Sequence, residues 1–154
     1  MKGYLLVVIA FLCSCGSNDT ADTSVTGKAL EVAAEVSTNV ADTLCFLRTE
    51  GVKDQDTAAI RLIIQNDEVT GTMNHIPFEK DARIGTIKGK KNGDIINGVW
   101  TYIQEGMEDS IAFSFRLKGD RLEQKATTFD PASGREVLPD TSGYRFDFSS
   151  VDCY

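Results

Sequence analysis

The sequence is poor in histidine, proline and basic residues. It has one histidine, three prolines, and 16 Lys and Arg against 23 Asp and Glu, which gives a formal net charge of −7. An acidic chain without clustered Lys and Arg is unsuited to the phosphate backbone of nucleic acids, so nucleic-acid binding is excluded. The only basic run, Lys88–Lys91, is short and is expected to lie in a turn.

The scarcity of histidine also limits the catalytic sites that the chain could build. A Ser–His–Asp or Cys–His site would have to use His75, and the sequence has no Gly-x-Ser-x-Gly segment. Pro77 interrupts the spacing between His75 and Glu79, which argues against a helical metal-binding pair. We expect His75 to face solvent at a strand end. We predict no catalytic residue, no metal site and no cofactor. The acidic residues of the loop Glu105–Asp109 are expected to be solvated, so no enzyme is expected and a hydrolase ranks last among the candidate functions.

Long hydrophobic runs are absent as well. The apolar stretch Tyr4–Leu12 is about half of the roughly 20 residues that a membrane-spanning helix requires. Together with Lys2 it has the charge and the length of a secretory signal peptide. The residues that end it, Leu12-Cys13-Ser14-Cys15, resemble the lipobox of bacterial lipoproteins.

This resemblance implies a signal peptide at residues 1–14 and a mature chain that begins at an acylated Cys15. It also implies a diacylglyceryl anchor, usually with an added N-acyl chain such as palmitate, and a place in the cell envelope at the outer membrane. Cys13 is the competing site, but small Ser14 directly before Cys15 fits the motif better. An uncleaved anchor, or cleavage by an ordinary signal peptidase, is the alternative.

Residues 15–42 are predicted to form a flexible tether, because Gly16–Ala41 is rich in Ser, Thr, Asp and Ala and has no aromatic residue. The acidic stretch Gly16–Asp22 resembles the segments that follow the acylated cysteine in surface-exported lipoproteins of Bacteroidota. It could equally be the start of an ordinary polar tether. The sequence therefore leaves open which face of the membrane carries the protein.

Residues 43–154 are predicted to form one all-β domain. Short alternating runs rich in β-branched residues are separated by turn residues, with Asn92-Gly93 as the sharpest hairpin signal. Gly98 in mid-strand predicts a bulge or a bend. The expected strands are Leu44–Arg48, Ala58–Gln65, Glu68–His75, Ala82–Lys88, Asp94–Gln104, Ser110–Lys118, Arg121–Phe129 and Tyr144–Phe148.

About eight strands joined by hairpin-length turns predict an antiparallel meander, either a small closed up-and-down β-barrel or an open β-sandwich. Cys45 lies in the first expected strand and Cys153 just after the last. A pair of cysteines in an exported chain predicts a disulfide, with two free thiols as the alternative. Because a disulfide requires neighbouring backbones, and a closed meander places its first and last strands side by side, the barrel is favoured.

Two further resemblances concern the β domain. The Gly-punctuated segments Gly85–Gly89 and Asn97–Trp100 resemble strands of small lipocalin- or avidin-like barrels. The whole of Thr43–Tyr154 resembles uncharacterised single-domain lipoproteins of Bacteroidota, through Val69–Met73 and Glu79–Asp81. Met73 stands where that family commonly has Leu, and the family implies no activity.

The expected function is that of a lipid-anchored envelope protein whose β domain is a binding or structural module without catalytic activity. Its partner would be the membrane, through the lipid, together with an envelope protein. The alternative is a carrier of a small apolar ligand, which would occupy the lumen beside Trp100, Tyr102 and Tyr144. The carrier requires a real cavity, whereas the interaction module requires a filled core and an apolar surface patch.

Overall fold

The fold of residues 40–153 is described by a computed structural model. The predicted signal peptide, the acylation site at Cys15 and most of the predicted tether lie outside the described residues. Within the described range, no helix is long and apolar enough to cross a membrane. Residues 40–153 form ten strands: β1 Asp42–Glu50, β2 Asp56–Gln65, β3 Glu68–Ile76, β4 Arg83–Asn92, β5 Ile95–Gln104, β6 Met107–Lys118, β7 Arg121–Lys125, β8 Thr128–Asp130, β9 Arg135–Val137 and β10 Tyr144–Val151.

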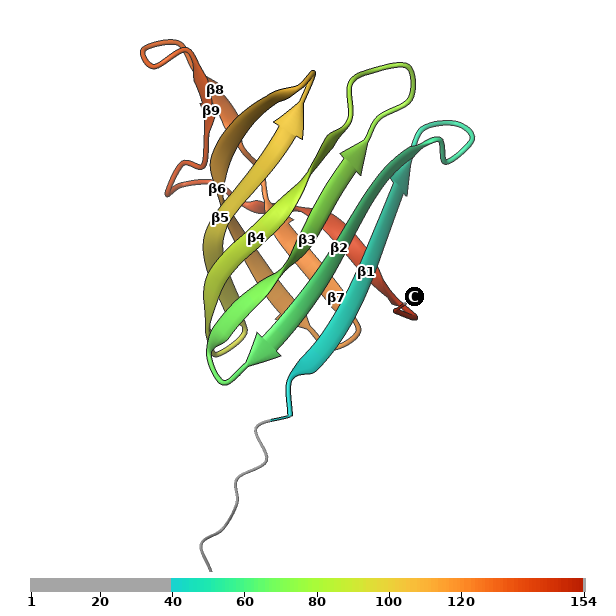
Figure 1. The fold of residues 1–154 in the computed structure, drawn as a ribbon, viewed down its shortest axis with the longest axis vertical. Coiled ribbons are helices and arrows are strands. Elements are labelled where there is room, and N and C mark those ends of the chain that lie inside the picture. The colour runs from blue at the N-terminus through green and yellow to red at the C-terminus, as the bar shows by residue number, and fades with distance from the viewer. Residues whose placement is uncertain (1–39, 154) are drawn as a thin grey trace, which may run out of the picture. The chain divides into compact units, whose positions relative to one another are not determined.

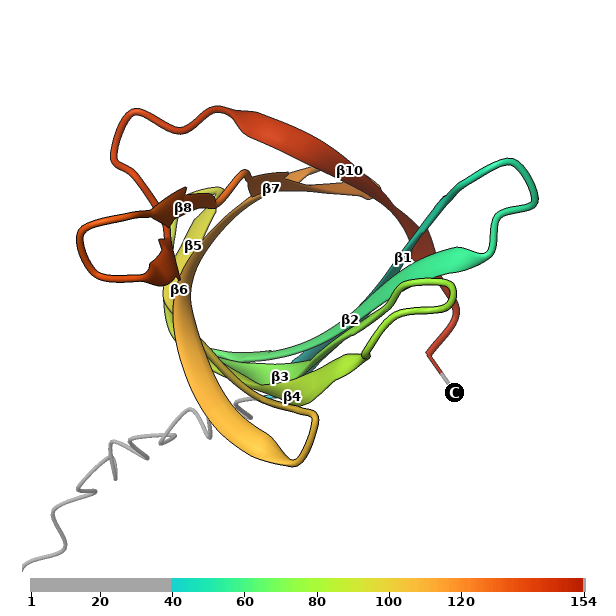
Figure 2. The same ribbon diagram turned by 90° about the horizontal axis from the view of Figure 1, so that it is seen from above.

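Eight of these strands close into an antiparallel barrel in the order β1-β10-β7-β6-β5-β4-β3-β2. Figure 1 shows the strands side by side, and Figure 2 looks along the barrel and shows the closed ring. The remaining two, β8 and β9, form a separate hairpin. The predicted closed barrel is confirmed, and the open sandwich is excluded.

The first and last barrel strands meet at a short seam. β1 pairs with β10 only at Cys45–Leu47, whereas it pairs with β2 along its whole length from Asp42 to Glu50. The structure joins Cys45 to Cys153 by a disulfide, with their Cα atoms 5.3 Å apart. The pair predicted from the sequence therefore lies at this seam.

Alternation along the strands decides which side chains fill the barrel. On β6, Ile111, Phe113 and Phe115 are buried inside, and on β2 the same holds for Ile60 and Leu62. The alternation in the sequence places these residues on one face of each strand. The period of two makes the assignment unambiguous, because a slip by one residue would expose every one of them.

Three two-residue turns lie together at one end of the barrel, which we call the closed end. They lie at Asn66-Asp67, Gly93-Asp94 and Gly119-Asp120, and Asn66 and Gly93 adopt positive φ angles of 57° and 58°. The predicted turn at Asn92-Gly93 is thus displaced by one residue. Above these turns lie fully buried side chains, among them Phe115, Phe148, Leu122, Ile96 and Val69. Burial of a side chain of this size stabilises a fold by about 1.5–3 kcal/mol, so this half is the packed core.

At Gly98 the sequence predicts a bulge or a bend, and the structure has no bulge there. The register between β4 and β5 runs without interruption through Gly89 and Gly98. A Cβ atom on Gly98 would lie 2.2 Å from the Lys88 carbonyl oxygen and 2.7 Å from Cζ of Phe113. Glycine is required here because neighbouring strands and the Phe113 ring approach the backbone closely.

The segment after β7 differs from the prediction of one continuous strand over Arg121–Phe129. β7 ends at Lys125, and β8 and β9 form a hairpin at the other end of the barrel, which we call the mouth. Arg135 binds this hairpin to β6 through an ion pair with Asp109 and a 3.2 Å hydrogen bond to the Ser110 carbonyl oxygen. Residues 51–55, residues 77–82 and the Glu105-Gly106 turn also lie at the mouth.

Candidate functional site

The upper half of the barrel contains a cavity of about 150 Å³ that opens at the mouth. Its position follows from the strand pattern, since the large residues that fill the closed end are replaced here by Ala58 and by polar side chains. The apolar part of the wall consists of Ala58, Met73, Trp100, Ile111, Ala112, Phe113 and Phe146. The polar part consists of Arg48, His75, Arg83, Gln124, Thr127 and Glu136.

Trp100 is held rigidly in the apolar part of the wall. Its indole Nε1 donates a buried 2.9 Å hydrogen bond to the Met73 carbonyl oxygen on β3. Its ring lies 4.4 Å from that of Tyr102, measured between centroids, in a tilted arrangement. A satisfied indole donor and a packed ring give the cavity a fixed flat surface.

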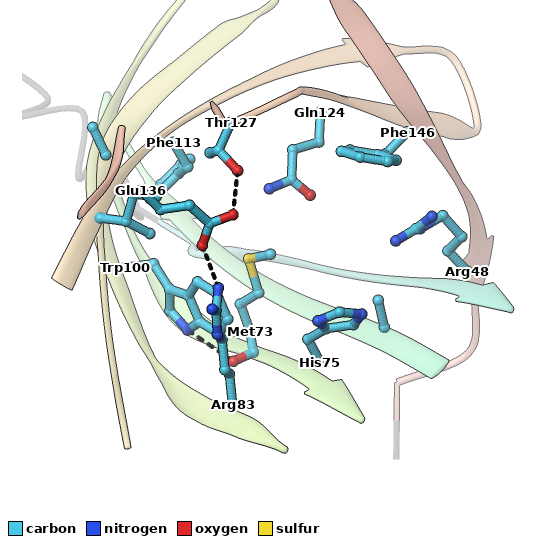
Figure 3. Close-up of a pocket in the computed structure, with 13 residues that line it drawn as sticks. Arg48, Met73, His75, Arg83, Trp100, Phe113, Gln124, Thr127, Glu136 and Phe146 are labelled. Atoms are coloured by element: carbon cyan, nitrogen blue, oxygen red, sulfur yellow. Dashed lines mark hydrogen bonds and ion pairs between the residues drawn. The ribbon is translucent and has the colours of Figure 1, made fainter. Parts of the chain in front are cut away.

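One polar side of the cavity is internally neutralised. Arg83 on β4 donates from Nη1 to Glu136 at 2.5 Å and from Nε to Gln104 at 2.8 Å. Thr127 donates to the other carboxylate oxygen of Glu136 at 2.9 Å. Figure 3 shows the contacts of Glu136 with Arg83 and Thr127, through which the β8–β9 hairpin is attached to the cavity wall.

Arg48 on the opposite side is less well satisfied. Its side chain is 14% exposed, and Nη1 forms an ion pair with Glu50, which is 57% exposed at the rim. Nε and Nη1 are nevertheless buried and lack an acceptor in hydrogen-bond geometry among the described residues. The guanidinium packs over Phe146, with Cζ 4.6 Å from the ring centroid.

His75 lies near Arg48 in the same cavity, which differs from the expectation that it faces solvent. It is half-buried, because β3 continues one residue beyond it and its register position turns the ring inward. Burial lowers the pKa of His75, and the positive charges of Arg48 and Arg83 lower it further. The imidazole is therefore neutral at neutral pH and can act as donor or acceptor without adding charge.

The three residues predicted to line the lumen lie in three different places in the structure. Trp100 lines the cavity. Tyr102 is buried beside it but does not line the cavity, and the Arg83 guanidinium covers its ring at 5.1 Å from the centroid. Tyr144 lies on the outer side of the barrel, where its hydroxyl is 3.2 Å from Ser114 and its ring contacts Arg116.

The misplacement of Tyr144 has a physical cause. A register shift between Tyr144 and Phe146 pairs Tyr144 with Lys125, which faces outward, while Phe146 pairs with Gln124, which faces the cavity. A bulge of this kind reverses the direction of one side chain relative to simple alternation. Gly143 precedes the strand, and no glycine lies inside β10 to mark the bulge in the sequence.

Sequence reasoning missed Arg48 and Glu136 as cavity residues. Arg48 ends the apolar alternation of its strand, and a charged residue at an inward position was the signal that could have identified it. Glu136 reaches the cavity only through the hairpin of β8 and β9, so its position depends on tertiary contacts. The acidic cluster of Glu105, Glu108 and Asp109 is exposed, as the sequence reasoning expected.

The lining residues set limits on the chemistry available. Among residues 40–153, no three His, Cys, Asp or Glu side chains are grouped as the ligands of a metal ion would be. The Thr127 hydroxyl donates its hydrogen bond to Glu136. No described contact joins it to His75, as a nucleophile would be joined to its general base. Comparisons with protein-family models, with curated proteins and with solved structures find no match for this chain.

Proposed function

We propose that this protein is a non-enzymatic binding module that holds a small, partly apolar molecule in the cavity at the barrel mouth. The observation that supports it is the cavity itself, a rigid half-apolar space with convergent polar groups above a packed core. Such a combination is typical of small-molecule sites. Of the two functions expected from the sequence, the carrier is the one that requires a hollow interior.

The ligand would be small. The volume of about 150 Å³ is below the 300–1,000 Å³ of sites for drug-sized molecules. It is close to that of an engineered protein cavity that takes up benzene. A molecule of about one ring, or a short branched chain with one polar group, matches this space.

The attachment of the domain is compatible with this use. β1 begins at Asp42 beside the closed end, where Asp42 pairs with Ile64 just before the Asn66-Asp67 turn. A lipid anchor at Cys15, which rests on the lipobox resemblance, would therefore join the barrel at the end opposite the mouth. The intact mass of the protein purified from its own membranes tests the anchor, because it should match a chain that starts at an acylated Cys15.

The test of binding uses Trp100, which is the only tryptophan of the chain. Titration with benzyl alcohol should change its fluorescence and its indole NMR signal. Ala58→Leu, which fills the cavity from β2, should weaken binding at least about tenfold, since it removes the space that the ring would occupy. Ala59→Leu is the matched control because Ala59 is the outward-facing neighbour on the same strand. An affinity that Ala58→Leu leaves unchanged, or no response of Trp100 at all, would contradict the proposal.

Interaction with an envelope protein is the second candidate. Exposed apolar side chains gather at the mouth and would give a partner an apolar contact surface. A photo-crosslinking residue at Phe129 should then yield one defined adduct in intact cells, and a residue at Arg61 on the barrel side should not. The exposed apolar side chains at the mouth include Ile76, Phe78, Ile84, Ile103, Met107 and Phe129.

A further inference from the structure

We propose that the mouth cavity selects a small monocarboxylate, whose anionic group lies against Arg48 and whose apolar body lies against Trp100 and Met73. This inference rests on the ligand-binding function proposed above and specifies the chemical class of the ligand. Its basis is a difference in hydrogen bonding between the two arginines of the cavity. Arg83 donates to acceptors in the wall, whereas Arg48 has buried donors that form no hydrogen bond.

Arg48 stands where the seam between β1 and β10 opens. The residue before it, Leu47, is the last one of β1 that pairs with β10, opposite Ser149. Arg48 points into the cavity, and its Cζ lies 4.6 Å from the ring centroid of Phe146 and 5.4 Å from that of Phe148. Contact with two aromatic rings holds the guanidinium in one place, so the charge is positioned before any ligand arrives.

Two donors of Arg48 are buried and form no hydrogen bond, although one of them takes part in an ion pair with Glu50. Nε and Nη1 have no acceptor in hydrogen-bond geometry among residues 40–153. The ion pair of Nη1 with Glu50 involves a carboxylate that is 57% exposed, and pairs open to water contribute little. Buried charged donors without acceptors are unfavourable. A carboxylate in the cavity would supply the missing acceptors through charge-assisted hydrogen bonds.

Arg83 is not available to a ligand in the same way. Its Nη1 and Nε donate to Glu136 and Gln104 at 2.5 and 2.8 Å, and the second oxygen of Glu136 accepts from Thr127 at 2.9 Å. The charges of Arg83 and Glu136 cancel within the cavity wall, whereas the ion-pair partner of Arg48 is Glu50, an exposed rim carboxylate that does not line the cavity. One positive charge matches a monoanion, and a cationic ligand would be repelled.

The neighbours of Arg48 suit the rest of a carboxylate ligand. Figure 3 shows His75 and Gln124 on the cavity wall at either side of the space that Arg48 enters, with no interaction drawn between them and the other lining residues. Neutral His75 and the Gln124 amide could each hydrogen-bond a carboxylate oxygen or a second polar substituent. The flat Trp100 ring and the Met73 side chain would cover an apolar ring or branched chain.

Benzoate, benzamide and benzylamine test this selectivity, because they share one ring but are an anion, a neutral amide and a cation at neutral pH. Their affinities can be measured by calorimetry and by Trp100 fluorescence. We expect benzoate to bind at least about tenfold more tightly than benzamide, the difference that a charge-assisted hydrogen bond supplies. Benzylamine should bind most weakly.

Two variants assign the selectivity to Arg48. Arg48→Gln should abolish the preference for benzoate over benzamide, whereas Arg61→Gln should retain it. Arg61 is the matched control because it lies exposed on the outer face of β2, and its replacement by Gln removes the same charge. Arg48→Lys keeps the charge and should keep a reduced preference, which distinguishes recognition from a purely structural role in the seam should Arg48→Gln fail to fold.

The outcomes separate the inference from the proposed function. Equal affinities for the three compounds, or a preference for benzoate that survives Arg48→Gln, overturn the carboxylate inference and leave ligand binding intact. A Trp100 signal that responds neither to these compounds nor to benzyl alcohol removes the proposed function, and the inference falls with it.

Discussion

Replacement of both Cys45 and Cys153 by serine should reduce the free energy of unfolding by about 4–5 kcal/mol. The disulfide closes a loop of 108 residues. In the chain-entropy model, releasing a loop of that length returns about 16 cal/mol/K to the unfolded chain, or about 4.8 kcal/mol at 25 °C. Domains of this size are stable by only about 5–15 kcal/mol, so the expected loss is a large share of the total.

Guanidinium unfolding followed by Trp100 fluorescence measures the loss, with the far-ultraviolet circular dichroism as a second probe. The wild-type protein with reduced thiols is the control, and it should lose the same amount as the double serine variant. Because β10 pairs with β1 only at Cys45–Leu47, faster amide hydrogen exchange should appear first in these two strands. A loss below about 1 kcal/mol would refute the reasoning, since the seam would then be held by its ladder and by packing alone.

Two further outcomes follow from the interior of the barrel. Gly98→Ala should destabilise the fold by about 1–3 kcal/mol through overpacking, since its Cβ would meet a carbonyl oxygen at 2.2 Å. A Cβ atom on Gly106 would have no atom within 4 Å, so Gly106→Ala should cost only about 1–2 kcal/mol for its positive φ. Equal losses of stability in the two variants, both larger than this, would contradict the crowding argument. The pKa of His75 is lowered by burial and by neighbouring arginines from its ordinary value of 6.5. Below that pH the unfolded chain takes up a proton that folded His75 resists, so stability falls as the pH falls. His75→Gln should flatten this dependence between pH 7.5 and 5, and an unchanged slope would refute it.

The barrel could be predicted from the sequence because its information is local. The alternation over Ser110–Lys118 fixes which face of β6 is inside, and turn residues such as Asn66-Asp67 mark where strands reverse. The pairing of Cys45 with Cys153 then chose closure over an open sandwich. The alternation and the turn residues each occupy a few neighbouring residues, and the cysteine pair is a covalent constraint. Neither kind of signal depends on how the rest of the chain packs.

The cavity could be predicted only in part, because its polar side is assembled from distant segments. Trp100 was identified through its aromatic character and its inward position. Glu136 reaches Arg83 across a separation of 53 residues, and no local pattern encodes that contact. Tyr144 was misplaced because one extra residue in a strand reverses its direction, and bulges carry a weak sequence signal when no glycine marks them.

The closed end of the barrel is packed with apolar side chains, whereas the mouth keeps buried polar ones. This difference supports a binding role for the mouth. At the closed end, Phe115 and Phe148 are fully buried in apolar surroundings, as a stable core requires. At the mouth, Arg48 keeps buried donors without acceptors, which lowers stability. Chains commonly retain such local conflicts where function demands them and compensate elsewhere. Here the compensation would come from the packed closed end and from the Cys45–Cys153 disulfide, both outside the cavity.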